Sequence, residues 1–229
     1  MNNILVIINK QFKDTFKNKA VLIQFILMPL IAFLMEKFIK PEDIPELFFT
    51  KMFSVMYMGM APLTAMAAII SEEKDKNTLR VLMMSNVKPW QYLIGVGSYI
   101  WMICMLGALA FTLNGIKAED TAFYLITMGC GFIISIVAGA CVGIFAKNQM
   151  AATSLATMLM FVLAFVPMFA QFNDDIKKAA KFIYTQQIRL SLDGMAFSEI
   201  QSNGVIILLA NAIIATVLFF VVFRKKGLE

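Results

Sequence analysis

The chain has 229 residues, of which 60% are apolar and only 15% are charged. A typical soluble domain is roughly 45–50% apolar and about 25% charged, so this chain carries more apolar surface than a soluble fold of its size can bury. The absence of histidine excludes imidazole-ligated metal sites and histidine-based catalysis. The composition also excludes a disordered chain and predicts a single all-α integral membrane domain over residues 1–229.

Residues 1–18 are predicted to form an amphipathic helix. Ile4, Leu5, Ile8, Phe12 and Phe16 recur near helical spacing, and the lysines of this segment lie on the other faces. Such a helix lies in the plane of the membrane interface, where its lysines contact anionic lipid. A charged start to the chain without this role is the alternative.

Six apolar runs are long enough to cross a bilayer as helices, for which about 20 residues are needed. None of them alternates apolar and polar residues as a strand of a membrane β-barrel does. The first run begins only after Asn18-Lys19 and no small-residue cleavage site follows it, so we expect it to remain in the mature protein. The six predicted spans cover residues 20–39, 53–70, 92–113, 121–146, 150–172 and 204–223.

Six crossings place both termini on the same side of the membrane. Lys and Arg are more frequent on that side, with clusters at residues 10–19 and 224–226, and basic residues favour the cytoplasmic face. We therefore expect a multi-pass protein of the cytoplasmic membrane with both termini in the cytoplasm. The positive net charge of +5 has the same origin, so no nucleic-acid partner is predicted. Residues 173–203 form an outer segment with an amphipathic helical pattern.

The fourth predicted span carries four small residues at a spacing of four. Residues at this spacing share one face of a helix, and small side chains on that face allow two helices to approach closely. We expect this face to pack inside the bundle; a dimerisation surface is the alternative. The four residues are Gly131, Ser135, Gly139 and Gly143.

The sequence carries no motif for chemistry of its own. It lacks the Gly-x4-Gly-Lys-[Ser/Thr] phosphate-binding loop, so the chain is not expected to hydrolyse ATP. No charge lies near the middle of a span, where proton or ion relays usually have one. No paired metal ligands are visible, and the three cysteines lie in apolar runs. We therefore predict no enzyme activity, no metal and no cofactor in this chain.

Residues 71–91, between the second and third spans, form the longest predicted cytoplasmic loop. Leu79, Leu82 and Met83 give a short apolar stripe at helical spacing, with Asn77 or Thr78 as the N-cap. Pro89 disfavours continuation of this helix. A short striped helix outside the membrane is expected to find no apolar partner within its own chain and to dock on another protein. The alternative is a helix that lies flat on the bilayer.

The order Glu73-x4-Thr78-Leu79-x2-Leu82, followed by Pro89 and Tyr92-Leu93, resembles the type-2 ABC transporter permeases. The resemblance extends to the topology of the whole chain. It implies that this loop is a coupling helix, which fits a groove on a separate ATPase subunit that binds ATP and Mg²⁺. The residues assigned to this contact are Glu72, Glu73, Asp75, Thr78, Leu79, Arg80, Leu82 and Met83.

Two positions depart from the pattern of that family. Asn77 stands where Gly is frequent, and Val96 stands where Lys often follows the Gly. The docking helix is retained, and only the subfamily is left open.

The leading interpretation is therefore the membrane subunit of an ABC exporter that works with a second permease, identical or related. Walls of Met and Phe favour apolar or amphipathic cargo such as antimicrobials, peptides or lipids. A membrane-bound immunity or scaffold protein that binds a toxin without transport is the alternative. A secondary transporter is disfavoured, because the spans lack midplane charge and inverted repeats. The resemblance places the second and fifth spans at the dimer interface, which implies a pathway along Met56, Met60, Met66, Met158, Phe161 and Phe165.

Overall fold

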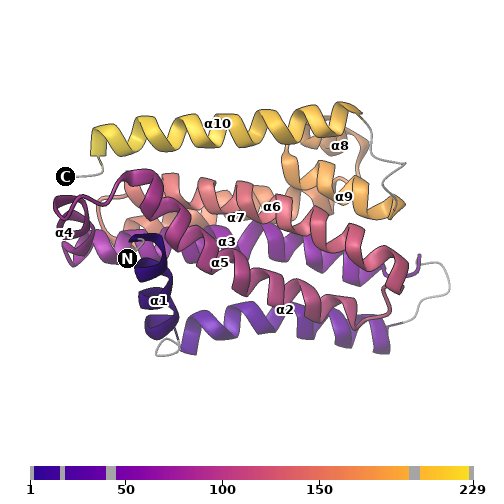
Figure 1. Cartoon of the computed structure of the whole chain (residues 1–229). Coiled ribbons are helices and arrows are strands. Elements are labelled where there is room, and N and C mark those ends of the chain that lie inside the picture. The colour runs from indigo at the N-terminus through magenta and orange to yellow at the C-terminus, as the bar shows by residue number, and fades with distance from the viewer. Residues whose placement is uncertain (1–2, 16–18, 40–44, 196–201, 227–229) are drawn as a thin grey trace.

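The structure is a computed structural model that describes residues 3–15, 19–39, 45–195 and 202–226. Every regular element within these ranges is an α-helix (Figure 1). Five of the helices, α3, α5, α6, α7 and α10, are long and apolar enough to cross a membrane. The all-α prediction is confirmed, and these helices indicate a multi-pass membrane protein. The helices are α1 (Asn3–Thr15), α2 (Lys19–Phe38), α3 (Phe48–Asp75), α4 (Thr78–Met84), α5 (Pro89–Thr112), α6 (Ala118–Phe145), α7 (Gln149–Phe169), α8 (Asp174–Ala180), α9 (Tyr184–Gly194) and α10 (Ser202–Lys226).

The long helices coincide with the predicted spans but several are longer. α3, for example, begins before residue 53 and continues past residue 70 as far as Asp75, because helical hydrogen bonding persists in the polar residues that flank an apolar run. The first predicted span coincides with α2, a 20-residue helix that runs along the bundle beside α3 and α5 (Figure 1). It is not among the five helices above, so the expectation of six spans is met in part. The outer segment 173–203 contains α8 and α9, and residues 196–201 lie outside the described ranges.

α3 is the most deeply buried of the five long helices, and α10 is the least buried. α3 packs mainly against α6 and α7, and also against α2, α5 and α9. The interface with α6 uses the small-residue face of that helix. A Cβ on Gly139 would lie 3.0 Å from the Cα of Leu63, and one on Gly143 would lie 2.8 Å from the Cβ of Ile70. Small residues at this spacing therefore let the α3 and α6 backbones approach closely.

The same face of α6 also carries buried hydrogen bonds to α3 and α9. Ser135 Oγ donates to the carbonyl oxygen of Met58 at 2.7 Å and lies 2.6 Å from the hydroxyl of Tyr184 on α9. Gly131 faces the side chain of Met58, where a Cβ would collide with the sulfur atom. The four small residues thus join α6 to both α3 and α9.

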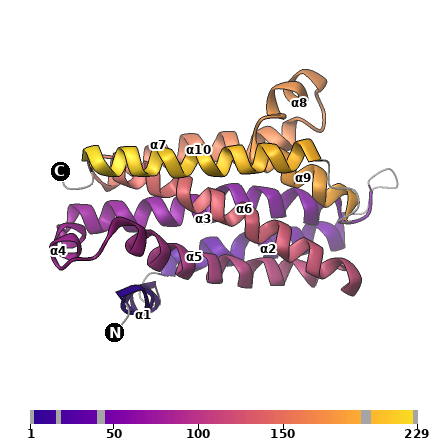
Figure 2. The same ribbon diagram turned by 45° about the horizontal axis from the view of Figure 1, so that its top comes forward.

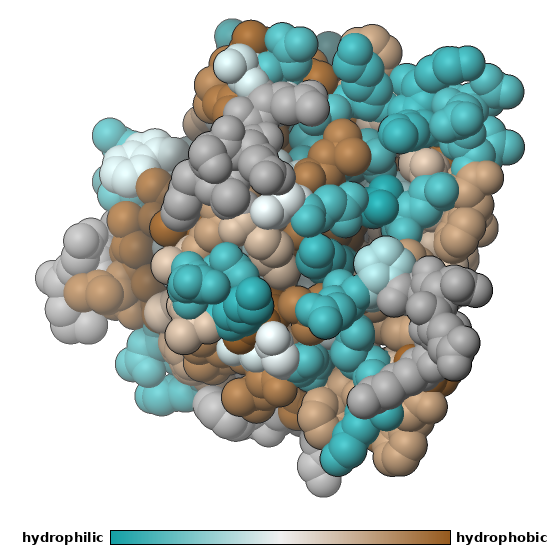
Figure 3. All heavy atoms as spheres, turned by 90° about the vertical axis from the view of Figure 1, so that its right-hand side faces the viewer, coloured by the Kyte–Doolittle hydropathy of each residue, from teal (hydrophilic) through white to brown (hydrophobic). Residues whose placement is uncertain are grey.

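The two ends of the bundle differ in their elements. α1 lies across one end against α5, where α4 and the C-terminal end of α10 are also found (Figures 1 and 2). α8 and α9 lie at the opposite end, whose surface is rich in hydrophilic side chains (Figure 3). Polar ends around an apolar bundle suit a protein that crosses a bilayer.

Candidate functional site

The candidate site is the end of the bundle formed by α1, α4 and the C-terminal end of α3. α4 begins at Thr78 and ends at Met84, so a short helix lies where the sequence predicts it. α5 then starts with Pro89, three residues before the predicted start of the third span. The apolar stripe of α4, however, is not without a partner in its own chain. Leu79 is only 1% exposed, and Leu82 and Met83 pack against the main core. That expectation is wrong, because α4 folds back onto α3, the helix that precedes it.

The outward face of α4 is made of different residues from those of the stripe. Val81 is 64% exposed and Met84 is 79% exposed, and Arg80 is exposed between Leu79 and Val81. Two apolar side chains and one cation on a short helix at the end of the bundle form a surface that another protein can contact. We call Arg80, Val81 and Met84 the α4 outer face.

Glu73 joins three helices at this end. Its carboxylate accepts hydrogen bonds from Lys10 Nζ and from Gln11 Nε2 at 2.8 Å, both on α1, and from the Tyr92 hydroxyl of α5 at 2.7 Å. Glu73 is only 6% exposed. The resemblance assigns Glu73 to the ATPase contact, whereas in this structure its side chain is buried against α1 and α5. A buried carboxylate is stable only when its oxygens are paired in this way.

The next two residues of α3 bond to the ends of two further helices. Lys74 Nζ donates to the carbonyl oxygens of Ile144 and Ala146 at 3.1 and 3.3 Å, at the C-terminal end of α6. Asp75 Oδ2 accepts from the backbone N–H of Gln149 at 2.8 Å, at the start of α7. A cation at a helix C-terminus and an anion at a helix N-terminus both satisfy free backbone groups and complement the helix dipole. The end of α3 is therefore bonded to α1, α5, α6 and α7.

Glu72 and Thr78 have local roles. Glu72 forms an exposed ion pair with Lys76, one helical turn away, which is worth only about 0.3–0.5 kcal/mol. The Thr78 hydroxyl donates to the carbonyl oxygen of Glu73 at 3.0 Å and so fixes the start of α4 against the end of α3. Neither contact reaches another part of the fold.

The turn between α3 and α4 depends on the backbone of Asn77. Asn77 has a φ of 56° and precedes the first residue of α4. This left-handed conformation is open to Gly and Asn but costly for other residues, especially β-branched ones. The left-handed conformation explains why Asn can stand at a position where the family that the sequence resembles often has Gly.

We expect Asn77→Gly to leave stability nearly unchanged and Asn77→Val to lower it by about 1–2 kcal/mol. The measurement is the melting temperature of the purified protein in detergent. Lys76→Val is the control, because it places the same side chain at the preceding, exposed residue, whose φ is −83°. The ion pair with Glu72 that it removes is worth only about 0.3–0.5 kcal/mol. Equal melting temperatures for the Gly and Val variants at position 77 would contradict this role of the backbone.

The six residues predicted to line a cargo pathway do not surround one cavity. Met56 is buried between α3 and α7, where Met60 and Phe165 pack beside it, and Met66 lies in the main core. Met158 and Phe161 are instead on the outer face of α7, at 69% and 54% exposure. The pathway residues therefore divide into a buried set and a set that faces away from this chain.

One ion pair at the opposite end of the bundle lies on α9. Arg189 pairs with Asp193 at 3.2 Å. Burial lowers the pKa of the Arg189 guanidinium and the nearby Asp193 carboxylate opposes that effect, while arginine stays charged throughout the physiological range. This pair stabilises the end of α9 and is not joined to the α3–α4 end.

Comparison with known proteins does not identify a family: no protein-family model matches the chain, and no curated protein is significantly similar to it. Among the described residues, no group of three or more His, Cys, Asp or Glu side chains is placed to hold a metal ion. The evidence for a function therefore comes from the geometry of the α3–α4 end.

The sequence does not reveal the partners of Glu73. Lys10 and Gln11 lie more than sixty residues before it in the chain, and no local spacing relates them. Local spacing does not relate Lys74 to the C-terminal end of α6 either. One available signal is Gln11, a polar residue that lies at helical spacing from the apolar Ile4 and Ile8.

Proposed function

We propose that this chain is the membrane subunit of an ATP-driven exporter of the type-2 ABC permease arrangement. In this proposal α2 crosses the membrane as well, as the first of six spans along the chain, and both termini lie in the cytoplasm. α4 is the coupling helix that contacts a separate ATPase. The observation that carries it is the α3–α4 end itself. A short helix exposes the α4 outer face, while the three residues before the turn bond to four other helices.

The energy for transport comes from the partner, which binds ATP and Mg²⁺. A displacement of α4 moves the end of α3 first, because Thr78 is bonded to the carbonyl oxygen of Glu73. Glu73, Lys74 and Asp75 then pass the displacement to α1, α5, α6 and α7. A packed bundle with such links moves between discrete arrangements rather than deforming gradually, which suits alternation between inward-facing and outward-facing states.

A second permease, identical or related, is proposed to pack on the outer face of α7. Met150, Met158 and Phe169 are 81%, 69% and 50% exposed. Phe161 and Phe165 stack at 5.1 Å between ring centroids on the same helix. A surface of Met and Phe adapts to varied apolar ligands, so hydrophobic or amphipathic cargo would move between the two α7 helices.

The coupling proposal is tested by Val81→Asp and Met84→Asp. We expect both variants to insert into the membrane normally. Each should co-purify with at least ten-fold less ATPase than the unaltered chain does, because a carboxylate would be desolvated in an apolar contact. The partner is identified by its phosphate-binding loop in mass spectrometry and by ATP hydrolysis in the purified assembly.

The matched control is Phe182→Asp, since Phe182 is 71% exposed but lies at the α8–α9 end of the bundle. ATPase recovery equal to that of the unaltered chain is expected for this variant. Undiminished recovery for both α4 variants would contradict the docking assignment. Absence of any ATPase with the unaltered chain would leave binding without transport as the function to pursue.

A further inference from the structure

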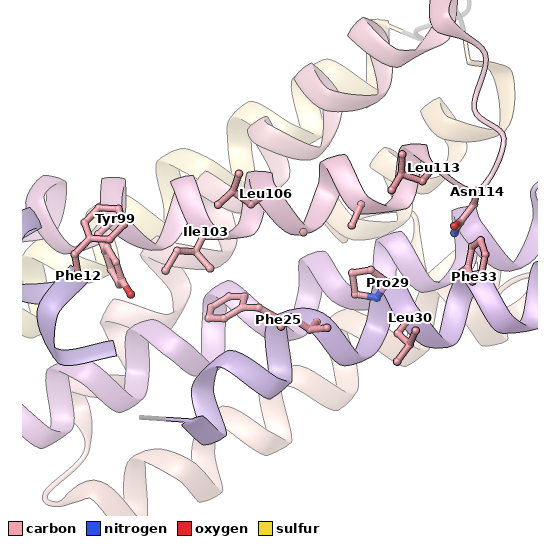
Figure 4. A pocket seen from close by; sticks show the side chains of 13 residues that line it. Phe12, Phe25, Pro29, Leu30, Phe33, Tyr99, Ile103, Leu106, Leu113 and Asn114 are labelled. Atoms are coloured by element: carbon pink, nitrogen blue, oxygen red, sulfur yellow. The ribbon is translucent and has the colours of Figure 1, made fainter. Parts of the chain in front are cut away.

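A cavity at the α8–α9 end of the bundle is lined by charged as well as apolar side chains. It has a volume of about 450 Å³, within the range of small-molecule sites, and its walls come from the start of α3, the end of α7, α8 and α9. The groove between α2 and α5, by contrast, is lined almost entirely by apolar side chains such as Phe25, Pro29 and Leu106 (Figure 4). Charged groups distinguish between ligands, so the cavity at the α8–α9 end is the better candidate for selective binding.

Two cations of this cavity converge on Asp193. The Arg189 guanidinium donates to the Asp193 carboxylate at 3.2 Å, and Lys51 Nζ donates to the Asp193 carbonyl oxygen at 3.3 Å. The Arg189 side chain is only 15% exposed, yet Asp193 is its one hydrogen-bond partner among the described residues. A guanidinium has five N–H donors. Arg189 therefore keeps donors for an anion that enters the cavity beside Lys51.

Two carboxylates of the same cavity have no cation partner. Glu46 lies just before α3 and Asp174 is the first residue of α8. Both are exposed, and neither forms an ion pair with a residue that the structure describes. A ligand with charge of one sign only would be repelled by one of the two sets of groups, whereas a ligand that carries an anion and a cation suits both. The charged lining residues are Lys51, Lys177 and Arg189 against Glu46, Asp174 and Asp193.

The cavity lies at the depth of lipid headgroups. α7 has 21 residues and ends at Phe169, so at 1.5 Å per residue it is roughly as long as the ~30 Å hydrocarbon core of a bilayer. Residues that directly follow this end line the cavity, among them Phe172. Phe172 is 72% exposed and Leu190, on the α9 wall, is 39% exposed. Apolar surface next to charged groups at this depth suits the part of a lipid where its headgroup joins its acyl chains.

We infer that this cavity binds the headgroup of a zwitterionic aminophospholipid of the phosphatidylethanolamine class. The phosphate lies against Arg189 and Lys51, and the ammonium lies against Glu46 and Asp174. A primary ammonium donates N–H hydrogen bonds to carboxylates, whereas the quaternary ammonium of phosphatidylcholine has no N–H to donate. This site is separate from the proposed ATPase contact, which lies at the other end of the bundle.

The test uses the full chain in phosphatidylcholine nanodiscs that contain a small fraction of phosphatidylethanolamine with a diazirine near the headgroup end of one acyl chain. Cross-links are mapped by mass spectrometry, and the competitors are unlabelled phosphatidylethanolamine, phosphatidylglycerol and soluble glycerophosphoethanolamine. We expect cross-links near Phe172 and Leu190. Phosphatidylethanolamine should compete about five-fold better than phosphatidylglycerol, the worth of one partly exposed ion pair. Glycerophosphoethanolamine, which has no acyl chains, should compete far more weakly than the lipid.

Charge reversal separates this site from lipid contact in general. Glu46→Lys combined with Asp174→Lys replaces two exposed carboxylates by cations and should reverse the preference, so that phosphatidylglycerol competes better than phosphatidylethanolamine. Asp175→Lys is the matched control, because it places the same charge on α8 at a side chain that is 90% exposed and lies outside the cavity lining. This control should keep the preference of the unaltered chain. Melting temperatures show whether each variant is folded.

Equal competition by phosphatidylethanolamine and phosphatidylglycerol against the unaltered chain would overturn the inference. So would an unchanged preference in the double lysine variant, or cross-links spread evenly over α6 and α10, which indicate ordinary contact with bilayer lipid. Competition by glycerophosphoethanolamine as strong as that by the lipid would overturn the assignment to a lipid and indicate a soluble zwitterion.

Discussion

Replacement of Gly139 by leucine is expected to abolish the folded state. Gly139 lies where α6 meets α3, and even a Cβ there would collide with the backbone carbonyl of Leu63. Backbone cannot move aside as the end of a flexible side chain can, so overpacking at this site should cost more than the usual ~1–3 kcal/mol. That is a large share of a total stability of about 5–15 kcal/mol. The measurement is the yield of monodisperse protein after detergent extraction.

The graded variant and the control come from the same helix. Gly139→Ala should be folded but should melt at a lower temperature, because it adds only the first atom of the clash. Cys130→Leu places the same leucine side chain at an exposed position of α6 and should be extracted as well as the unaltered chain. Normal yield for Gly139→Leu would contradict the close packing of α3 and α6.

Replacement of Glu73 by leucine is expected to be the most damaging change at the α3–α4 end. It removes the common acceptor of Lys10, Gln11 and the Tyr92 hydroxyl. Gln11 and Tyr92 are buried, and each unpaired buried polar group costs about 1–3 kcal/mol. We expect a loss of several kcal/mol and the release of α1 from α5, seen as a lower melting temperature and faster proteolysis after Lys13.

Three comparisons isolate the role of Glu73. Glu73→Gln keeps an acceptor for Tyr92 and should lose only about 1–2 kcal/mol. Tyr92→Phe removes one of the three bonds and should fall in the same range. Glu72→Gln breaks an exposed ion pair and should change stability by less than about 0.5 kcal/mol. If Glu73→Leu melted like Glu72→Gln, the carboxylate would not be what holds α1 in place.

Variants of Glu73 also distinguish the stability of this chain from its contact with the ATPase. Because its side chain is buried within this chain, Glu73→Gln should retain ATPase co-purification, in contrast to Met84→Asp. The resemblance assigns both the acidic residue and the apolar stripe to the partner contact. In this structure the stripe and Glu73 instead contact other parts of the same chain. The residues that face outward are Arg80, Val81 and Met84.

Local composition is sufficient to predict the helices and their approximate ends. Apolar runs of about 20 residues give spanning helices in any context that lacks water, because the backbone must satisfy its own hydrogen bonds. Pro89 likewise starts α5, since proline is favoured in the first turn and excluded from the interior of a helix. The spacing of the small residues on α6 similarly places Gly131 and Gly139 on one face before any partner helix is known.

The tertiary structure alone reveals which surface each residue faces. The stripe on α4 has the same helical spacing whether it packs inward or outward, and only the packing of α4 on α3 places Leu79 in the core. Glu73 meets Lys10, and Asn114 meets Thr50, across more than sixty residues of chain. Periodicity describes one helix at a time, whereas a polar network or a groove arises where several helices meet.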